Sequence, residues 1–426
     1  MACEWYLLRS RAAWPLATVK GLASVFVCLA IAGCQSAVTP APQEKMGQFQ
    51  SDLAFLRQHT GVVVLSGEPG AGEVAVAPAY QGRVMTSTTG GGDAPSFGWL
   101  GRAAITSGRR QPHMNVFGGE DRFWLGPEGG QYALYFKPGD PFDLDHWQVP
   151  EAFDWATWEI ASQSPGSVSF RKHLALENYS GSTLEIDVDR TVRLLTDADI
   201  AEQLGAPPGR AVRTVAFESS NTVTNAGKTA WTAPSGLVSV WILGQFNPTP
   251  ATTIALPYSP GPTSSMGPVV NDTYFGKVPA DRLIIKEAVI FFRGDGQYRS
   301  KIGLPPARAL PVAGSYDASG HVLTLVQYTR PAGAVNYVNS MWEIQHEPYK
   351  GDVINSYNDG PPAPGKPPLG PFYELETSSP ALSLGPGERY THIHRTFHCV
   401  GPEEELDRIA RATLKVGISD LAGAFR

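Results

Sequence analysis

The stretch 184–195 reads LEIDVDRTVRLL, and its alternation decides the fold. The apolar side chains of Leu184, Ile186 and Val188 fall on one face of an extended chain, and the acidic residues between them fall on the other. This two-residue period predicts a half-buried β-strand. Arg190 falls on the apolar face, where an unpaired charge is costly. We therefore expect it either to be paired or to project into a cavity between sheets.

Turn-forming residues separate several other segments with the same alternation. The 426 residues include 45 glycines and 36 prolines, a density typical of many short strands joined by turns. Further strands are predicted at 211–218, 237–243, 283–292, 321–328, 341–346, 372–377 and 389–400. A long helix is predicted only after Pro402, where glutamates precede apolar residues at helical spacing. We therefore expect a mainly β protein, a large antiparallel β-sandwich with a short C-terminal helix.

The composition excludes several classes of protein. With 42% hydrophobic and 17% charged residues, the chain is neither disordered nor a polytopic membrane protein. Its formal net charge of -6 provides no general basic surface, so no nucleic-acid partner is expected. The sequence contains no CxxC pair and no cysteine–histidine zinc spacing. The prediction is an acidic, β-rich protein without a metal or other cofactor.

An export signal is predicted at the amino end. Basic residues occur before position 21, and the apolar run 21–33 (GLASVFVCLAIAG) follows. This run is shorter than the roughly 20 residues that span a bilayer as a helix. A basic start and a short apolar run are together typical of a signal peptide. The run ends in IAGC at 31–34, which is similar to a bacterial lipobox, so we expect lipid to be attached to Cys34.

This signal sets the expected domain boundaries and location. Residues 1–33 are predicted to be a lipoprotein signal peptide, 34–48 a Pro/Ala-rich tether and 49–426 the folded domain. The lipid on Cys34 would hold the domain at a membrane of a bacterial cell envelope, in the periplasm or at the outer membrane. An ordinary secretory signal with an incidental cysteine is the alternative. Cys399 would be the other thiol of the mature chain, and its alternation with Phe397 predicts a core position.

The last two predicted strands supply a candidate site. If 372–377 and 389–400 pair as a hairpin, their polar faces coincide. The first strand contributes two carboxylates to that shared wall and the second contributes three imidazoles: Glu374 and Glu376, then His392, His394 and His398. Such a wall suits general acid–base chemistry on a sugar, or metal ligation. A solvated strand face with titratable residues is the alternative.

Three motifs in this region occur in a recognisable order: NSYNDG at 355–360, LET at 375–377 and PGERY at 386–390. In this order they resemble the C-terminal part of the aldose 1-epimerases, the galactose mutarotase-like family. The resemblance implies the supersandwich fold of that family, a sugar substrate and Glu376 as the catalytic base. The family's general-acid histidine has no counterpart in 241–247 (WILGQFN), so His394 is the candidate proton donor.

A glycine-rich segment at 118–131, GGEDRFWLGPEGGQ, offers a stacking face and polar groups of the kind that bind sugars. With this segment, most of 50–415 resembles an uncharacterised group of bacterial mutarotase-like lipoproteins. A structural turn with a core tryptophan is the alternative interpretation of the segment. The predicted substrate-binding residues are Arg122, Trp124, Glu128, Gln131, Arg190, Glu374 and His392.

Three functions are consistent with these patterns. The first is a lipid-anchored envelope protein that binds a carbohydrate and, in an enzymatic version, modifies it, with Glu376 accepting a proton and His394 donating one. For this version, Glu376→Gln is expected to preserve stability because size and shape are kept. The second is a non-catalytic structural or assembly lipoprotein. The third is a cupin-like metal-binding protein, because PGE at 386–388 precedes His392 and His394 in an order similar to the cupin motif.

Overall fold

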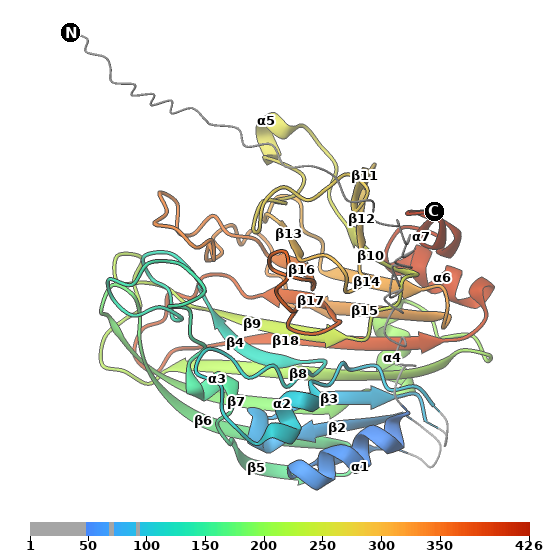
Figure 1. Cartoon of the computed structure of the whole chain (residues 1–426), viewed down its shortest axis with the longest axis horizontal. Helices are drawn as coiled ribbons and strands as arrows, with labels where there is room; N and C mark the ends of the chain where they lie inside the picture. Colours follow the sequence, from blue (N-terminus) through green and yellow to red (C-terminus); the bar gives the residue numbers. More distant parts are fainter. Residues whose placement is uncertain (1–47, 68–71, 91–93) are drawn as a thin grey trace, which may run out of the picture. The chain divides into compact units, whose positions relative to one another are not determined.

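Two large antiparallel sheets, one of ten strands and one of five, form the body of the protein in the computed structural model (Figure 1). The structure describes residues 48–67, 72–90 and 94–426. The predicted signal peptide 1–33, Cys34 and all but the last residue of the 34–48 tether lie outside the described residues. The predicted fold class, a mainly β antiparallel sandwich with a short C-terminal helix, is confirmed, and a second short helix follows the predicted one.

The ten-stranded sheet contains the segment that first indicated a β fold. Its strands, in order across the sheet, are β11 (Leu283–Lys286), β12 (Val289–Arg293), β10 (Thr252–Pro257), β14 (Val312–Asp317), β15 (Val322–Tyr328), β18 (Arg389–Val400), β8 (Arg213–Asn225), β7 (Thr183–Leu194), β6 (Ser167–Glu177) and β5 (Glu159–Ser164). Along β7, Ile186 and Val188 are buried, whereas Asp187 between them is exposed. The predicted faces of this strand are therefore confirmed.

The five-stranded sheet packs against the larger one. Its strands, in order, are β13 (Ser300–Leu304), β16 (Ile354–Asn358), β17 (Tyr373–Ser378), β9 (Ser239–Phe246) and β4 (Arg122–Gly126). Apolar residues of both sheets, such as Leu375 and Val326, meet in one buried cluster. A further sheet consists of β1 (Val63–Ser66), β2 (Glu73–Ala77) and β3 (Arg83–Thr88).

Helices cover the sheets at several places. They are α1 (Phe49–His59), α2 (Arg102–Ser107), α3 (Glu151–Asp154), α4 (Asp197–Leu204), α5 (Thr263–Met266), α6 (Glu403–Thr413) and α7 (Ile418–Gly423), with a 3-10 helix η1 (Pro78–Tyr80). The predicted C-terminal helix is α6, which begins after Pro402. Its Leu406 packs with Phe397 and Cys399 of β18 in a buried cluster. The core position predicted for Cys399 is therefore confirmed.

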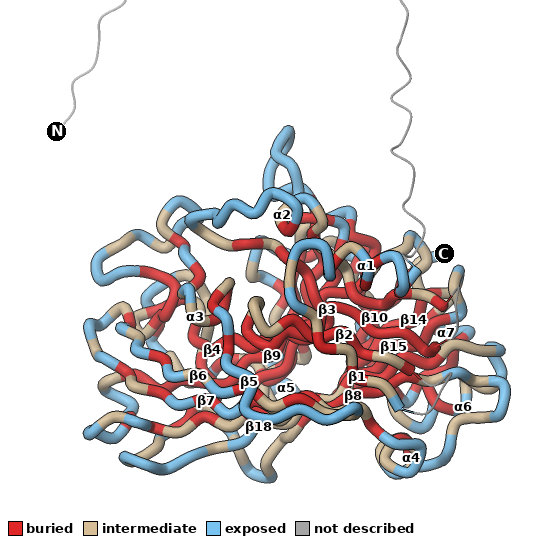
Figure 2. Tube along the Cα trace, turned by 90° about the horizontal axis from the view of Figure 1, so that it is seen from below, coloured by how far each residue is buried: buried red, intermediate tan, exposed pale blue. Residues whose placement is uncertain are grey.

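Burial is concentrated in the strands that lie between layers. Figure 2 shows mostly buried residues along β9, β14 and β15, whereas the residues of the edge strand β5 are exposed. β9 is buried on both faces. One face packs in the sandwich interior, and side chains of neighbouring loops cover the other. The helices of the described part of the chain are all too short or too polar to cross a membrane.

Three strand predictions are wrong. Residues 283–292 form two strands, β11 and β12, because Ala288 turns the chain with a φ of 63°. Residues 341–346 lie in a loop. The segments 372–377 and 389–400 do not form a hairpin: β17 lies between β16 and β9, whereas β18 lies between β15 and β8. The segment that connects β17 to β18 first forms a β-bridge between Leu382 and Val238, beside the start of β9. It then crosses to the larger sheet.

Candidate functional site

The candidate site lies on the face of the five-stranded sheet that points away from the sandwich interior, and we call this face the floor. Residues two apart on each strand share it. Glu374 of β17 lies opposite Gln245 of β9 and Tyr357 of β16, and Tyr357 lies opposite Lys301 of β13. Strand pairing thus places one polar row across four strands.

A second and a third row lie beside the first. Glu376 lies opposite Leu243 of β9, and Leu243 lies opposite Arg122 of β4. Two residues further along the same strands, Trp241 lies opposite Trp124. The sheet therefore places the glycine-rich segment 118–131 and the LET segment on either side of β9, although they are far apart in the sequence.

An open pocket with about 790 Å³ of space, part of it continuous with solvent, lies over the floor. Its tryptophans come from the sheet and from two loops: Trp124, Trp241, Trp147 and Trp342. Its charged side chains are Arg122, Glu128, Arg299, Lys301, Asp359 and Glu374. Aromatic walls with a small number of convergent polar groups are typical of small-molecule sites.

Glu374 is held by two polar side chains of the floor. Arg122 Nη2 lies 2.5 Å from Glu374 Oε1, and Gln245 Nε2 donates to the same oxygen at 2.9 Å. Burial raises the pKa of Glu374 to about 7, although the nearby Arg122 charge acts to lower it. The Arg122 guanidinium also lies 4.8 Å from the ring centre of Trp124. The pocket therefore contains a carboxyl group that titrates near neutral pH.

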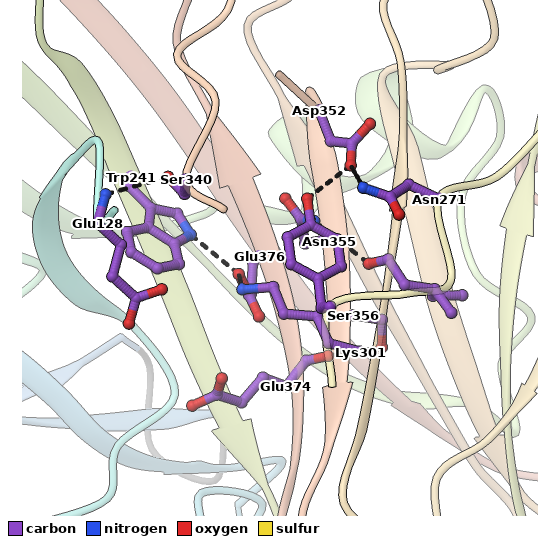
Figure 3. A network of polar contacts seen from close by, with 12 residues as sticks. Glu128, Trp241, Asn271, Lys301, Ser340, Asp352, Asn355, Ser356, Glu374 and Glu376 are labelled. Atoms are coloured by element: carbon purple, nitrogen blue, oxygen red, sulfur yellow. Dashed lines mark hydrogen bonds and ion pairs between the residues drawn. The ribbon is translucent and has the colours of Figure 1, made fainter. Parts of the chain in front are cut away.

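Glu376 lies beneath the pocket and is fully buried. Lys301 Nζ donates to Glu376 Oε2 at 2.8 Å, and Trp241 Nε1 donates to the same oxygen at 3.0 Å (Figure 3). Burial lowers the pKa of Lys301, but the charges of Glu376 and Glu128 outweigh that effect, and the net shift is upward. Lys301 therefore presents a stable positive charge to the pocket, which it lines.

Among the side chains that line the pocket, three buried atoms have no hydrogen-bond partner in the described part of the chain: Arg122 Nε, Trp147 Nε1 and Gln245 Oε1. Leaving a buried polar atom unpaired costs about 1–3 kcal/mol, so most such atoms have a partner. Donors and an acceptor without partners in the same pocket suit hydroxyl groups, which can pair with either.

A smaller polar recess adjoins the pocket, and Trp241 and Lys301 line both. Tyr274 donates to Asp352 Oδ2 at 2.6 Å, and Asn355 Nδ2 donates to the Tyr274 hydroxyl at 3.0 Å. Burial raises the pKa of Asp352 to about 6. The Lys301 ammonium lies 5.4 Å from the ring centre of Tyr274 and 4.8 Å from that of Trp241. The recess therefore helps to fix the position of Lys301.

The structure brings part of the predicted site together. The predicted residues that line the pocket are Arg122, Trp124, Glu128 and Glu374. Gln131 is placed differently: its side chain bonds to the backbone of Gln345 at 2.9 and 3.0 Å. This contact ties the glycine-rich segment to the loop that carries Trp342, so Gln131 acts on the pocket only through that loop.

The histidine row lies on the other side of β17. Thr377 follows Glu376 and therefore points to the opposite face. Its hydroxyl lies 3.0 Å from His392 Nε2 and 2.9 Å from His394 Nδ1, inside the sandwich. Burial lowers the pKa of His392 to about 3 and that of His394 to about 4, so both rings are neutral at pH 7. The predicted shared wall of carboxylates and imidazoles is therefore wrong, and His394 does not line the pocket.

Two other predicted polar residues are also paired in the interior. Arg190 Nη2 lies 2.6 Å from Asp121 Oδ1, and its Nε donates to the Gly82 carbonyl at 3.1 Å. His398 Nε2 lies 2.9 Å from Glu120 Oε2. Arg190 is fully buried, and the structure shows the paired alternative rather than a side chain projecting into the pocket.

The cupin-like alternative lacks its ligand cluster. Glu388 is exposed and accepts a hydrogen bond from the Gly385 backbone, whereas His392 and His394 bond to Thr377. Within the part of the chain that the structure describes, no group of three or more His, Cys, Asp or Glu side chains is arranged to hold a metal ion.

Sequence reasoning misses several lining residues. Trp241 and Gln245 share the floor through their even spacing on β9, and Arg299 and Lys301 are likewise two residues apart at the start of β13. This spacing is a usable signal for a common face. It does not indicate which face carries a pocket, and the loop residue Trp342 has no periodic signal at all.

These features define the class of protein: an antiparallel β-sandwich with an open, tryptophan-lined pocket on its smaller sheet. Residues 47–425 match the model of the Family of unknown function (DUF6786), and the chain belongs to that family. The comparison with curated proteins finds no match.

Several solved structures, among them two mutarotase-like or mutarotase-related proteins, are distantly similar to this chain. A galactose mutarotase-like protein from Lactobacillus casei ATCC 334 is 12% identical, covers 79% of this chain and 100% of its own, and has a TM-score of 0.44. The galactose mutarotase related enzyme from Lactobacillus acidophilus is 9% identical, covers 79% of this chain and 97% of its own, and has a TM-score of 0.44. A protein of Synechocystis sp. PCC 6803 is 11% identical, covers 80% of this chain and 96% of its own, and has a TM-score of 0.46. The similarity to these solved structures is distant.

Proposed function

We propose that the pocket binds a carbohydrate. One observation carries the proposal: Arg122 Nε and Gln245 Oε1, which have no partner among the described residues, lie in a pocket lined by tryptophans. A sugar presents hydroxyl groups that both donate and accept hydrogen bonds, and apolar C–H faces that pack on aromatic rings. An entirely apolar ligand would leave both buried atoms unpaired, at a cost in affinity.

Isothermal titration with a panel of neutral and acidic sugars tests this proposal. Gln245→Met keeps the side-chain length but removes the amide, and it should weaken the best ligand by about tenfold or more. Arg171→Gln, on the exposed outer face of β6, is the matched control and should change nothing. Thermal melting establishes that each variant is folded. The proposal fails if no sugar of the panel binds, or if folded Gln245→Met binds as tightly as the wild type.

A second candidate function is proton transfer to or from the bound sugar, and the position of Glu374 favours it. Glu374 lines the pocket, and burial raises its pKa to about 7, where a carboxyl group can act as a base or an acid near neutral pH. We therefore propose Glu374 as the catalytic group, in place of Glu376, which is fully buried beneath the pocket. Glu374→Gln should then abolish catalysed anomer exchange, measured by proton NMR, while sugar binding persists. Binding without faster exchange in the wild type would reduce the function to binding alone.

We also propose that the domain is attached to the membrane of a bacterial envelope through lipid on Cys34. The support is the order of elements in the sequence: a basic start, the apolar run 21–33 and the cysteine that follows it. The pocket would then act on glycans or sugars that reach the cell envelope.

A further inference from the structure

The charges that line the pocket are not matched one to one. Arg122 pairs with Glu374, and Lys301 pairs with Glu376. Arg299 also lines the pocket, but its guanidinium group makes no hydrogen bond or ion pair with any residue that the structure describes. One cation of the described pocket lining therefore has its hydrogen-bond donors available.

The other carboxyl groups of the lining have partners of their own. Asp359 accepts hydrogen bonds from the Tyr357 hydroxyl at 2.7 Å and from the Gly370 backbone at 2.8 Å. The side chain of Trp342 acts to lower the pKa of Glu128. Burial raises the pKa of both acids, whereas the charge of Arg299 acts to lower it, although Arg299 forms no ion pair with either acid in the described structure. Neither acid is positioned as a salt-bridge partner for the unmatched cation.

An aromatic ring holds Arg299 in place. Its guanidinium carbon lies 3.9 Å from the ring centre of Phe275, which also lines the pocket. Such a cation–π contact uses the flat face of the guanidinium and leaves the N–H groups at its edge free. The side chain is thus oriented before any ligand binds, which lowers the entropy lost on binding.

Building on the proposed function, we propose that the sugar is a hexuronic acid, free or at the end of a glycan, and that Arg299 binds its carboxylate. The planar guanidinium can donate two parallel hydrogen bonds to a planar carboxylate. A single negative charge matches the single unmatched cation. A dianionic phosphate would bring a second negative charge, for which the described pocket lining has no further unpaired cation. Arg122 and Gln245 remain available to the sugar hydroxyls.

The test is isothermal titration of the full folded domain with glucuronate, galacturonate, glucose, galactose and glucose 6-phosphate. The wild type should bind each uronate at least about tenfold more tightly than the matching hexose. Arg299→Gln should abolish this preference and leave hexose affinity within about twofold. Arg299→Lys should restore part of the preference, since it restores the charge without the planar fork. Arg171→Gln should behave as the wild type, and melting curves check that all variants fold.

Three results would overturn the assignment: no preference of the wild type for uronates, equal loss of hexose and uronate affinity in Arg299→Gln, or tighter binding of glucose 6-phosphate than of glucuronate. In each of these cases a sugar still binds, so the proposed carbohydrate function survives. If none of the five sugars binds, the acidic-sugar assignment fails, and the broader panel decides whether the proposed function fails with it.

Discussion

Replacing Glu376 by glutamine should destabilise the protein by about 3 kcal/mol, although the change keeps size and shape. Glu376 is fully buried, and the side chain of Lys301 is only 9% exposed, with 2.8 Å between Nζ and Oε2. At an effective dielectric constant of about 20, the attraction at this distance is about 6 kcal/mol before desolvation is counted. The amide would leave a buried ammonium without its closest negative charge. The expectation from sequence alone, that this change preserves stability, is therefore reversed by the structure.

The neighbourhood of Lys301 sets the size of this effect. Breaking a buried ion pair by removing one partner costs about 3–5 kcal/mol. Glu128 and Glu374 also act on the Lys301 charge, so they compensate part of the loss and favour the lower end of that range. The glutamine carbonyl can still accept the hydrogen bond of Trp241, which removes one further source of destabilisation.

Urea unfolding followed by tryptophan fluorescence at pH 7 measures the effect. In a double-mutant cycle with Lys301→Met, the two single changes should sum to about 2 kcal/mol more than the double change, because the double variant leaves no unpaired charge. Glu185→Gln, at a surface pair with His173, is the control and should cost less than about 1 kcal/mol. If Glu376→Gln costs no more than this control, or if the two changes are additive, the ion pair does not have the strength inferred here.

Three further predictions concern the interior and the amino end. Burial lowers the pKa of His392 to about 3 and of His394 to about 4, so the unfolded state binds more protons below about pH 6.5. The free energy of unfolding should therefore fall on acidification from about pH 6.5 to 4, by up to about 1.4 kcal/mol per pH unit for each ring. His394→Gln should make the slope of unfolding free energy against pH, measured by urea unfolding, shallower. An unchanged slope would contradict the burial of a neutral ring. Burial raises the pKa of Cys399 to about 12, so a thiol reagent should label it only after denaturation, and rapid labelling of the folded protein would place it elsewhere. Cys34→Ala should leave an unprocessed precursor that takes up no fatty-acid label in a bacterial host, whereas continued labelling would exclude lipidation at this residue.

The strand faces are the part of the site that sequence predicts well. Glu374 and Glu376 share a face, and His398 and Cys399 lie on opposite faces, as the alternation requires. These relations depend only on the backbone geometry of an extended chain, in which successive Cβ atoms point to opposite sides. The same argument would group Arg299 with Lys301.

Which strands pair with one another is the part of the site that the sequence does not predict. The segments that contain Glu374 and His394 follow one another, yet they lie in different sheets, and the histidine contacts the opposite side of the carboxylate's strand. The short-range pattern is the same for a hairpin and for a crossover between layers, because both bury one face of each strand.

By itself, the sequence determined that the protein is a mainly β sandwich with a C-terminal helix, and which side chains share a strand face. The tertiary structure decided which of those faces form a pocket. Arg122, Gln245, Lys301 and Glu374 meet only because the five strands of the smaller sheet pair in one register. Arg190, a charged residue on the apolar face of its strand, is instead buried with Asp121 in the interior. The physical reason is that alternation follows from local backbone geometry, whereas burial and charge pairing depend on packing between residues far apart in the chain.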